Sequence, residues 1–330
     1  MKTLFPFEQL YNVIDDTANI VSEQLDCTYL EAIAETCENL HYNDVLQDEL
    51  SEVTKKRLLK EYEKINLSAF AKEDIRKAYQ LTILKGMKEA AQPNHQMTPD
   101  AVGIFVGYLV SKFMKEQQHF TILDPTIGTG NLLSAVVNQN RSKLMDSMGV
   151  DLDDLLLKLA YVGANLMEYP LQLFHQDSLE DLLIDPADVV VCDLPVGYYP
   201  NDERAKQFET RAASGHSYAH HLFIEQSINY MRPGGYGLFL VPNTLFETEQ
   251  SVKLNEYIKQ VSYIQGFIQL PNSMFKQEAA AKSILILQKK ATEIAKPKQA
   301  LLVSMPKFSN KEAMQGIMAQ IDDWFVAENK

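Results

Sequence analysis

The chain has 330 residues, enough for one large domain or two ordinary ones, and 46% of them are hydrophobic. Much of its formal net charge of −13 lies at the start, where residues 1–50 hold eleven acidic residues and one basic residue, Lys2. Proteins that bind nucleic acid mainly through phosphate contacts usually carry a basic field, and the totals show none. Any nucleic-acid binding is therefore expected to be local or assisted by a partner.

The sequence predicts a cytoplasmic protein without a membrane segment. Its longest apolar runs are shorter than the roughly 18 residues that a membrane-spanning helix needs. The N-terminal residues include acids where a signal peptide needs an apolar core. Cys27, Cys37 and Cys192 form no C-x-x-C pair and are interpreted as reduced thiols.

Residues 1–92 are predicted to form a helical domain. They contain no glycine before Gly86 and one proline, Pro6, and apolar residues such as Leu58 and Tyr62 recur at helical spacing. The acidic stretch in this part has two interpretations. It is either a solvated helix face or a docking surface for a protein partner or a second copy of the chain.

The composition changes near residue 93, where we place the start of a second domain that runs to residue 330. Thr98-Pro99-Asp100 has the form of a helix start, with Thr98 as the cap and Pro99 in the first turn. From Val102 to Phe113 apolar residues recur at i, i+3, i+4 and i+7, which predicts an amphipathic helix.

Strands and helices then alternate, which predicts a doubly wound, mostly parallel sheet of seven strands. A short link between the last two strands favours an antiparallel pair at one edge. "LLVSMP" is a candidate for a further strand, and residues 311–328 are expected to end the chain as a helix. The seven strand-like runs are 120–125, 148–152, 171–177, 187–195, 236–242, 264–271 and 283–288.

The first strand ends in "LDPTIGTGNLL", a glycine-containing turn before a helix that begins at Asn131. Glycine at positions 128 and 130 allows positive φ angles and a close approach of a ligand to the backbone. Asp151 ends the second strand 21 residues after Gly130. In dinucleotide-binding folds a carboxylate at about this spacing holds ribose hydroxyls. A two-glycine turn alone would be weak evidence, but carboxylates at both strand ends favour a cofactor site.

Two residues bear on which cofactor this is. A pyrophosphate-binding loop would have a third glycine where this chain has Leu133, and the carboxylate of Asp124 would repel a pyrophosphate. Asp124 suits an ammonium group instead, and S-adenosylmethionine has both an amino-acid head and a ribose. A nicotinamide-dependent dehydrogenase is therefore disfavoured.

Several segments resemble the adenine-N6 DNA methyltransferases, most closely the modification subunit of type I restriction systems. They lie in order at the right spacing over about residues 93–290: "MTPDAV", "LDPTIGTGNLL", "GVDLDDLLLKLAYVGANLM", "HQDSL", "AHHLFIEQSINYMRPGGYGLFLVPNTLF" and "GFIQLPNSMFKQEAAAKSILILQKK". The resemblance implies a Rossmann-like class I methyltransferase fold that uses S-adenosylmethionine.

The resemblance also assigns residues to that cofactor. Asp151, with its neighbour Leu152, would hold the ribose, and Asp177, with Ser178, the adenine. Asp177 has a second interpretation, as a capping acid for a following helix. The methionine end would be lined by Thr98, Asp124, Pro125, Gly128, Thr129, Gly130 and Asn131.

The catalytic motif departs from the family pattern of D/N/S-P-P followed by an aromatic residue. Adenine's exocyclic amine is a poor nucleophile, so a side-chain oxygen and a backbone carbonyl must accept its hydrogens while a ring stacks on the extruded base. This chain has "DLPVGYYP". It keeps Asp193 and Pro195 but has Val196 in place of the aromatic residue. Tyr198 and Tyr199, slightly further on, are candidates for the missing ring.

Three interpretations stay open for this motif. The protein methylates an amino nitrogen, with adenine in DNA the first acceptor to consider; it acts on a substrate other than DNA; or it binds the cofactor without transferring a methyl group and serves as a partner-binding module. No metal is expected, because His216, His220 and His221 lack a third ligand motif.

Overall fold

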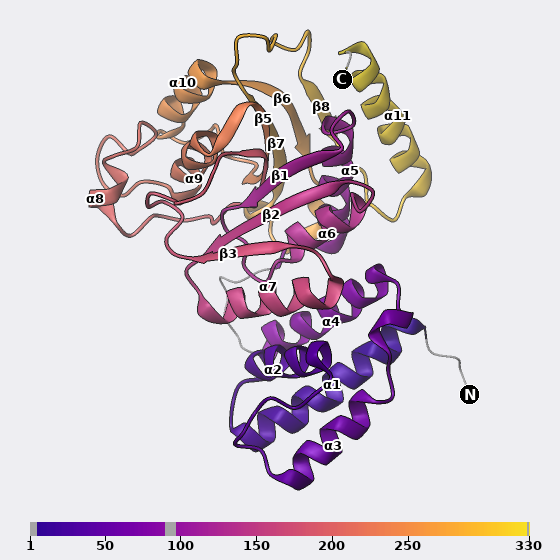
Figure 1. Cartoon of the computed structure of the whole chain (residues 1–330). Coiled ribbons are helices and arrows are strands. Elements are labelled where there is room, and N and C mark those ends of the chain that lie inside the picture. The colour runs from indigo at the N-terminus through magenta and orange to yellow at the C-terminus, as the bar shows by residue number, and fades with distance from the viewer. Residues whose placement is uncertain (1–4, 90–96, 329) are drawn as a thin grey trace.

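The computed structural model describes residues 5–89, 97–328 and 330. The domain boundary expected at residues 92 and 93, and the break at Pro93, lie outside them. Figure 1 shows a group of helices at one end of the molecule and a larger α/β part at the other. No helix among the described residues is both long and apolar enough to cross a membrane.

The helical part is built from four helices, of which the second and third have side-chain caps. Thr28 caps the second helix by accepting a hydrogen bond from the Glu31 amide, and the Glu31 carboxylate accepts from the Thr28 amide in return. Ser51 caps the third helix in the usual way. The helices are α1 (Pro6–Leu25), α2 (Tyr29–Tyr42), α3 (Glu52–Tyr62) and α4 (Lys72–Glu89), with a 3-10 turn at Leu67–Ala69.

The second part contains an eight-stranded sheet in the order β3-β2-β1-β4-β5-β7-β6-β8. Strand β7 is antiparallel to both of its neighbours, and the other adjacent strands are parallel. The strands are β1 (His119–Asp124), β2 (Leu144–Asp151), β3 (Leu171–His175), β4 (Ala187–Asp193), β5 (Met231–Pro242), β6 (Ser262–Gln269), β7 (Lys282–Lys289) and β8 (Leu301–Ser304).

Helices bury both faces of this sheet, so the central strands are apolar without interruption. In β4, Val189 and Val191 belong to one core, while Val190 and Cys192 belong to the core on the opposite face. Residues of α5 (Asp100–Phe113), α6 (Asn131–Gln139), α7 (Asp154–Met167) and α11 (Lys311–Ala327) fill the first core. Residues of α9 (Ala219–Asn229) and α10 (Ser251–Val261) fill the second.

The predicted Rossmann-like fold and the preceding helical domain are confirmed, and the last two predicted strand runs do form an antiparallel pair, β6 and β7. This pair does not itself form the edge of the sheet, because β8 lies outside β6. "LLVSMP" does supply a strand, β8, which pairs in parallel with β6 and makes the sheet eight-stranded instead of seven-stranded. The C-terminal helix is present as α11.

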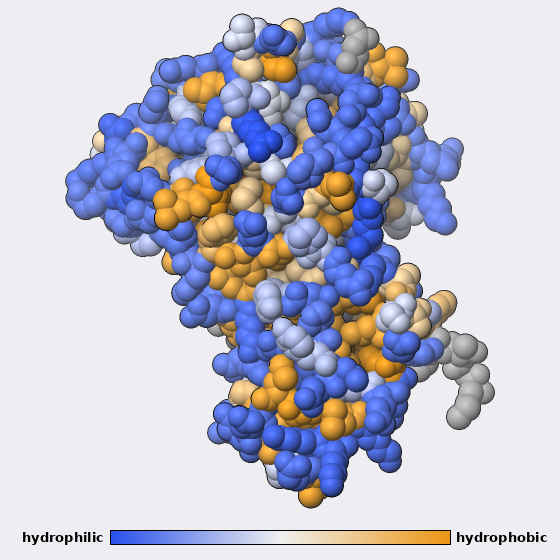
Figure 2. Space-filling model, in the orientation of Figure 1, coloured by the Kyte–Doolittle hydropathy of each residue, from blue (hydrophilic) through white to orange (hydrophobic). Residues whose placement is uncertain are grey.

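The helical part packs on α7, on which α2 and α4 both lie. The Tyr79 hydroxyl of α4 donates to the Leu159 carbonyl of α7 over 2.6 Å. A Cβ at Gly163 of α7 would come within 2.7 Å of the Tyr79 ring, so glycine permits this close approach. Figure 2 shows hydrophobic residues across the middle of the molecule and again over the helical part, with hydrophilic residues covering much of the remaining face.

A buried arginine gives a second link between the two parts. Arg76 of α4 is 1% exposed, and its guanidinium makes two hydrogen bonds to Glu73 and one of 2.6 Å to Asp100, the first residue of α5. Glu73 also accepts a hydrogen bond from Asn138 of α6. Arg76 therefore fixes the start of α5 and the end of α6 relative to the helical part.

We expect Arg76→Met to lower the free energy of unfolding by about 2–3 kcal/mol, because it leaves two partly exposed carboxylates without their shared cation. Lys88→Met, which removes an exposed cation from the same helix, should change it by less than about 0.5 kcal/mol. Urea unfolding followed by circular dichroism measures both. Equal effects in the two variants would contradict a linking role for Arg76.

Candidate functional site

Three carboxylates lie together at the carboxyl ends of adjacent parallel strands. Asp124, Asp151 and Asp193 are the last residues of β1, β2 and β4, which are adjacent and parallel. The strand order reverses between β1 and β4, and open α/β sheets bind ligands in the crevice at such a switch point, outside the carboxyl ends of the strands. The candidate site is therefore centred on the ends of these three strands.

The glycine loop between β1 and α6 adopts the backbone that its sequence predicts. Gly128 and Gly130 have φ angles of 52° and 77°, in the left-handed region. A Cβ at Gly130 would lie 3.3 Å from the Cβ of Ala160 on α7, whereas one at Gly128 would meet no atom within 4 Å. Gly130 therefore packs the loop against α7, and Gly128 leaves open space beside it.

Asp124 is buried, and among residues 5–89, 97–328 and 330 it has one hydrogen-bond donor, the amide of Thr126 at 3.1 Å. Burial raises the pKa of Asp124 to about 8, and the charges of Asp151 and Asp193 act in the same direction. A buried carboxyl group with spare acceptor capacity favours binding of a cation, because a cation would restore its ionised form.

Asp151 holds the glycine loop against the end of β2. One carboxylate oxygen accepts a hydrogen bond of 2.8 Å from the Gly128 amide, and the other accepts one of 3.1 Å from the Asp153 amide. Its neighbour Leu152 is exposed. The hydrogen bond from Gly128 therefore fixes the glycine loop and the Asp151 carboxylate relative to each other.

Thr98 does not cap α5, which corrects one of its two predicted roles. The N-cap position is Pro99, and no side chain caps this helix. The Thr98 hydroxyl instead donates to Asp193 Oδ2 over 2.8 Å, and its carbonyl accepts a hydrogen bond of 2.7 Å from the Asn131 amide side chain. A local rule predicted a cap, but the tertiary structure places this side chain at the site.

Lys282 is a site residue that the sequence analysis missed. Its ammonium lies 2.5 Å from Asp193 Oδ1, so both carboxylate oxygens of Asp193 have a partner. Lys282 is the first residue of β7 and aligns with Pro242, the last residue of β5. Because β7 is antiparallel, it begins at the edge where the parallel strands end. A lysine directly before an apolar strand was the only local signal.

The two tyrosines after Asp193 have different environments. Tyr199 is buried, and its hydroxyl donates to Asp177 Oδ2 over 2.6 Å. It offers no open face to a base, which corrects its assignment as a stacking ring. Tyr198 is 60% exposed and stacks on Tyr218, with ring centroids 4.9 Å apart and an interplanar angle of 10°. Of the two predicted candidates, Tyr198 alone presents a ring to solvent.

Asp177 and Ser178 connect the end of β3 to the site. Asp177 Oδ1 accepts from the Leu179 amide, and no helix follows, so the residue closes a turn instead of capping a helix. The Ser178 hydroxyl donates to the Pro125 carbonyl over 2.5 Å. Together these contacts bring the β3 end, the glycine loop and Tyr199 into one hydrogen-bonded unit.

Leu194 stands where the family motif has its first proline, and the structure gives this leucine a backbone contact that depends on the difference. Leu194 is buried, and its amide donates to the Leu240 carbonyl of β5 over 3.3 Å. A proline at this position would have no N–H to donate. Pro195 and Val196 are exposed. Leucine therefore extends the β4–β5 pairing by one hydrogen bond beyond Asp193.

The histidines near α9 have packing and surface roles. His220 and His221 are buried, and burial lowers their pKa values to about 4 and about 3. His216 is exposed and hydrogen-bonds to Asp202. Across the described part of the chain, no group of three or more His, Cys, Asp or Glu residues has the arrangement of a metal site.

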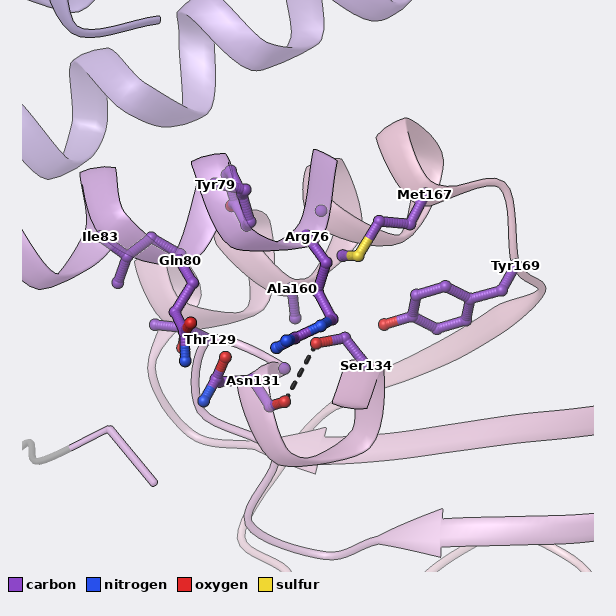
Figure 3. A pocket seen from close by; sticks show the side chains of 12 residues that line it. Arg76, Tyr79, Gln80, Ile83, Thr129, Asn131, Ser134, Ala160, Met167 and Tyr169 are labelled. Atoms are coloured by element: carbon purple, nitrogen blue, oxygen red, sulfur yellow. Dashed lines mark hydrogen bonds between the residues drawn. The ribbon is translucent and has the colours of Figure 1, made fainter. Parts of the chain in front are cut away.

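A small cavity lies behind the glycine loop, and residues of the helical part line it (Figure 3). Arg76 and Gln80 approach from α4, and Thr129, Asn131 and Ser134 form the opposite wall. Its volume of about 10 Å³ is room for about one water molecule, so it cannot hold a nucleoside. Helix α4 therefore supports the glycine loop at this cavity, and none of the three carboxylates is among the residues that line it.

Two family models match the chain. The model of the N-6 DNA Methylase family matches residues 71–325, and the YtxK N-terminal helical domain matches residues 8–87. The chain is also 50% identical over 321 residues to the Bacillus subtilis protein YtxK, described as uncharacterized, with 97% of each chain covered.

Solved structures share this architecture. A Listeria monocytogenes protein, described as a class I S-adenosylmethionine-dependent methyltransferase, is 46% identical with a TM-score of 0.90, covering 97% of this chain and 99% of its own. The methyltransferase subunit of a Streptococcus thermophilus type I restriction-modification system is 18% identical with a TM-score of 0.65, covering 96% and 74%. This second likeness concerns the fold alone. The chain therefore belongs to the N-6 DNA methylase family, with a class I methyltransferase fold preceded by a helical domain of the YtxK type.

Proposed function

We propose that the protein transfers a methyl group from S-adenosylmethionine to an amino nitrogen, with N6 of adenine in DNA as the leading acceptor. The observation that carries this proposal is the meeting of Asp124, Asp151 and Asp193 at three adjacent strand ends. Two of these carboxylates suit two parts of the cofactor, and the third suits the acceptor.

The residues present fit the cofactor. Asp124 is a buried carboxyl group with one donor, as expected of a residue that receives the ammonium of an amino acid. Gly128 leaves open space beside the loop, and Asp151, held by two backbone amides, has further lone pairs for ribose hydroxyls. When bound, S-adenosylmethionine supplies a methyl group activated by the positive sulfonium. Thr98, Asn131 and Asp177 would complete its surroundings.

Asp193 is placed to hold the acceptor. Its carboxylate would accept a hydrogen bond from the acceptor's N–H, which favours a more tetrahedral and nucleophilic nitrogen. In the transfer, the N–C bond forms as the S–C bond breaks, and the nitrogen loses a proton to solvent. The exposed ring of Tyr198, stacked on Tyr218, would support a base extruded from the duplex.

One observation favours a second candidate, a cofactor-binding protein without transfer. Val196, which is exposed, stands where the family has its aromatic ring, and Tyr198 is displaced by two residues along the chain. A base that cannot stack would not stay at Asp193. In that case the helical domain would be the working part, as a docking unit for a partner.

The acidic charge bears on how DNA would be recognised. A chain with this balance gains little from phosphate contacts, so we propose that a partner supplies part of the DNA contact. An open groove between α1 and α4 is a candidate docking place for it. The groove is lined by Phe7, Glu8, Tyr11, Asn12, Leu81, Leu84, Lys85 and Lys88.

Both candidates can be tested in lysate of a strain that lacks the protein. Radiolabelled S-adenosylmethionine is added together with the purified wild type or one of its variants. We expect the wild type to label a fraction that DNase removes. Asp193→Ala should lower that label at least about 100-fold, because the variant loses the group that holds the acceptor, while affinity for S-adenosylhomocysteine, which has no sulfonium, changes by less than about threefold. Asp185→Ala, which removes an exposed carboxylate near β4, should label like the wild type.

Digestion of the labelled material identifies the acceptor polymer. Label that survives DNase and disappears with protease would reject DNA as the acceptor. If neither protein labels any fraction although both bind the cofactor, the second candidate is the correct one.

The affinity for S-adenosylmethionine should depend on pH through Asp124. In the free protein its pKa of about 8 keeps it protonated at pH 6, and the ligand's ammonium requires the carboxylate. Affinity should therefore rise by up to about tenfold per unit from pH 6 toward 8. Above pH 8 it should fall, because the ligand's α-amino group (pKa about 8) loses its own proton.

Calorimetric titration at several pH values, with wild type and Asp124→Asn, measures this dependence. The variant should bind more weakly near pH 8 and lose the rise between pH 6 and 8, since it has no proton to release. A wild-type affinity that stays constant over this range would show that Asp124 does not receive the ammonium.

A further inference from the structure

The ammonium of Lys282 lies beside Asp193, where the acceptor nitrogen is proposed to bind. Its ammonium lies 2.5 Å from Asp193 Oδ1, while Thr98 donates to Oδ2. A carboxylate has about four lone-pair positions, so Asp193 keeps room for one or two further hydrogen bonds. The acceptor would therefore join an existing ion pair and would not meet a bare carboxylate.

The side chains of the pair are 25% exposed for Lys282 and 18% exposed for Asp193. Both groups can thus be reached from solvent, yet water screens them less than it screens groups on an open surface. An acceptor that came with its own ammonium would sit beside Lys282 and be repelled. A neutral amine would lose nothing from that neighbour and could use the remaining lone pairs.

We propose that Lys282 determines the acceptor class: by balancing the charge of Asp193 it restricts the site to neutral, conjugated amino nitrogens, such as those of nucleobases, and excludes alkylammonium groups. This inference rests on the proposed function, because it takes Asp193 as the residue that holds the acceptor. Lys282 acts through Asp193 and is a positioning residue.

The same charge acts on the cofactor and the product. S-adenosylmethionine carries a sulfonium that S-adenosylhomocysteine lacks, and the sulfonium must approach the acceptor for transfer. Lys282 therefore weakens binding of the cofactor relative to that of the product. Removal of its charge should strengthen binding of the sulfonium compound selectively, by at least about fivefold after allowance for screening.

The test compares affinities for S-adenosylmethionine and S-adenosylhomocysteine by calorimetry in wild type, Lys282→Met and Lys282→Arg. We expect the affinity ratio to shift at least about fivefold toward S-adenosylmethionine in the methionine variant. The arginine variant keeps the charge and should stay within twofold of the wild type. Lys276→Met, which removes an exposed cation on the segment before β7, should also stay within twofold.

A double variant separates charge from shape. Lys282→Met combined with Asp193→Asn removes both charges, so the affinity ratio should return to within twofold of the wild-type value. A double variant that behaves like Lys282→Met alone would overturn the proposal. If the methionine variant fails to fold, as judged by its melting temperature, Lys282→Gln removes the charge and keeps a donor.

Binding of n-butylammonium to the complex with S-adenosylhomocysteine tests the acceptor class directly, by ligand-observed nuclear magnetic resonance. Lys282→Met should bind it at least about fivefold more tightly than the wild type, while 1-butanol should bind equally to both. Unchanged affinity for butylammonium, together with an unchanged cofactor ratio, would overturn the role of Lys282. Failure of the proposed function would appear differently, either as a wild type that binds neither cofactor nor product or as one that binds both and labels no fraction in the transfer assay.

Discussion

Three carboxylates at the carboxyl ends of adjacent strands repel one another. Different groups of the protein stabilise each of them. Asp151 receives two backbone amides from the loops beside it. Asp193 receives an ammonium and a hydroxyl from segments distant in sequence. Asp124 receives one amide, and its pKa rises to about 8. The carboxyl group with the least support is thus the one best suited to bind a cation from outside the protein.

The supporting groups come from segments that lie far apart in the sequence. The antiparallel direction of β7 brings Lys282 to the edge where β4 and β5 end. The segment before α5 brings Thr98, and α5 is itself held at Asp100 by Arg76 of the helical part. A chain of contacts therefore runs from α4 through the start of α5 to Asp193. Helix α4 also lines the cavity behind the glycine loop (Figure 3), so the helical part belongs to the architecture of the site.

The sequence predicts those features that local chemistry determines. The positive φ angles of Gly128 and Gly130, the carboxylates at the ends of β1 and β2 and the amphipathic helix α5 all follow from short-range patterns. Features that depend on distant segments could not be predicted in this way. Lys282 contacts Asp193, which is 89 residues away in sequence. Thr98 makes a tertiary hydrogen bond to Asp193 instead of capping α5. The position of β7 inside the sheet depends on strand pairing that no local pattern encodes.

The residues after Asp193 form an ordered segment that makes specific contacts with neighbouring elements. The Leu194 amide makes a hydrogen bond that proline could not make, and it extends the pairing of β4 with β5. The Tyr199 hydroxyl binds Asp177, which joins the end of β4 to the end of β3. Tyr198 stacks on Tyr218, and the Gly197 carbonyl accepts from the Ala219 amide, which ties the segment to the start of α9. These contacts order the segment that follows Asp193, and the exposed ring of Tyr198 lies on it, stacked on the partly buried Tyr218.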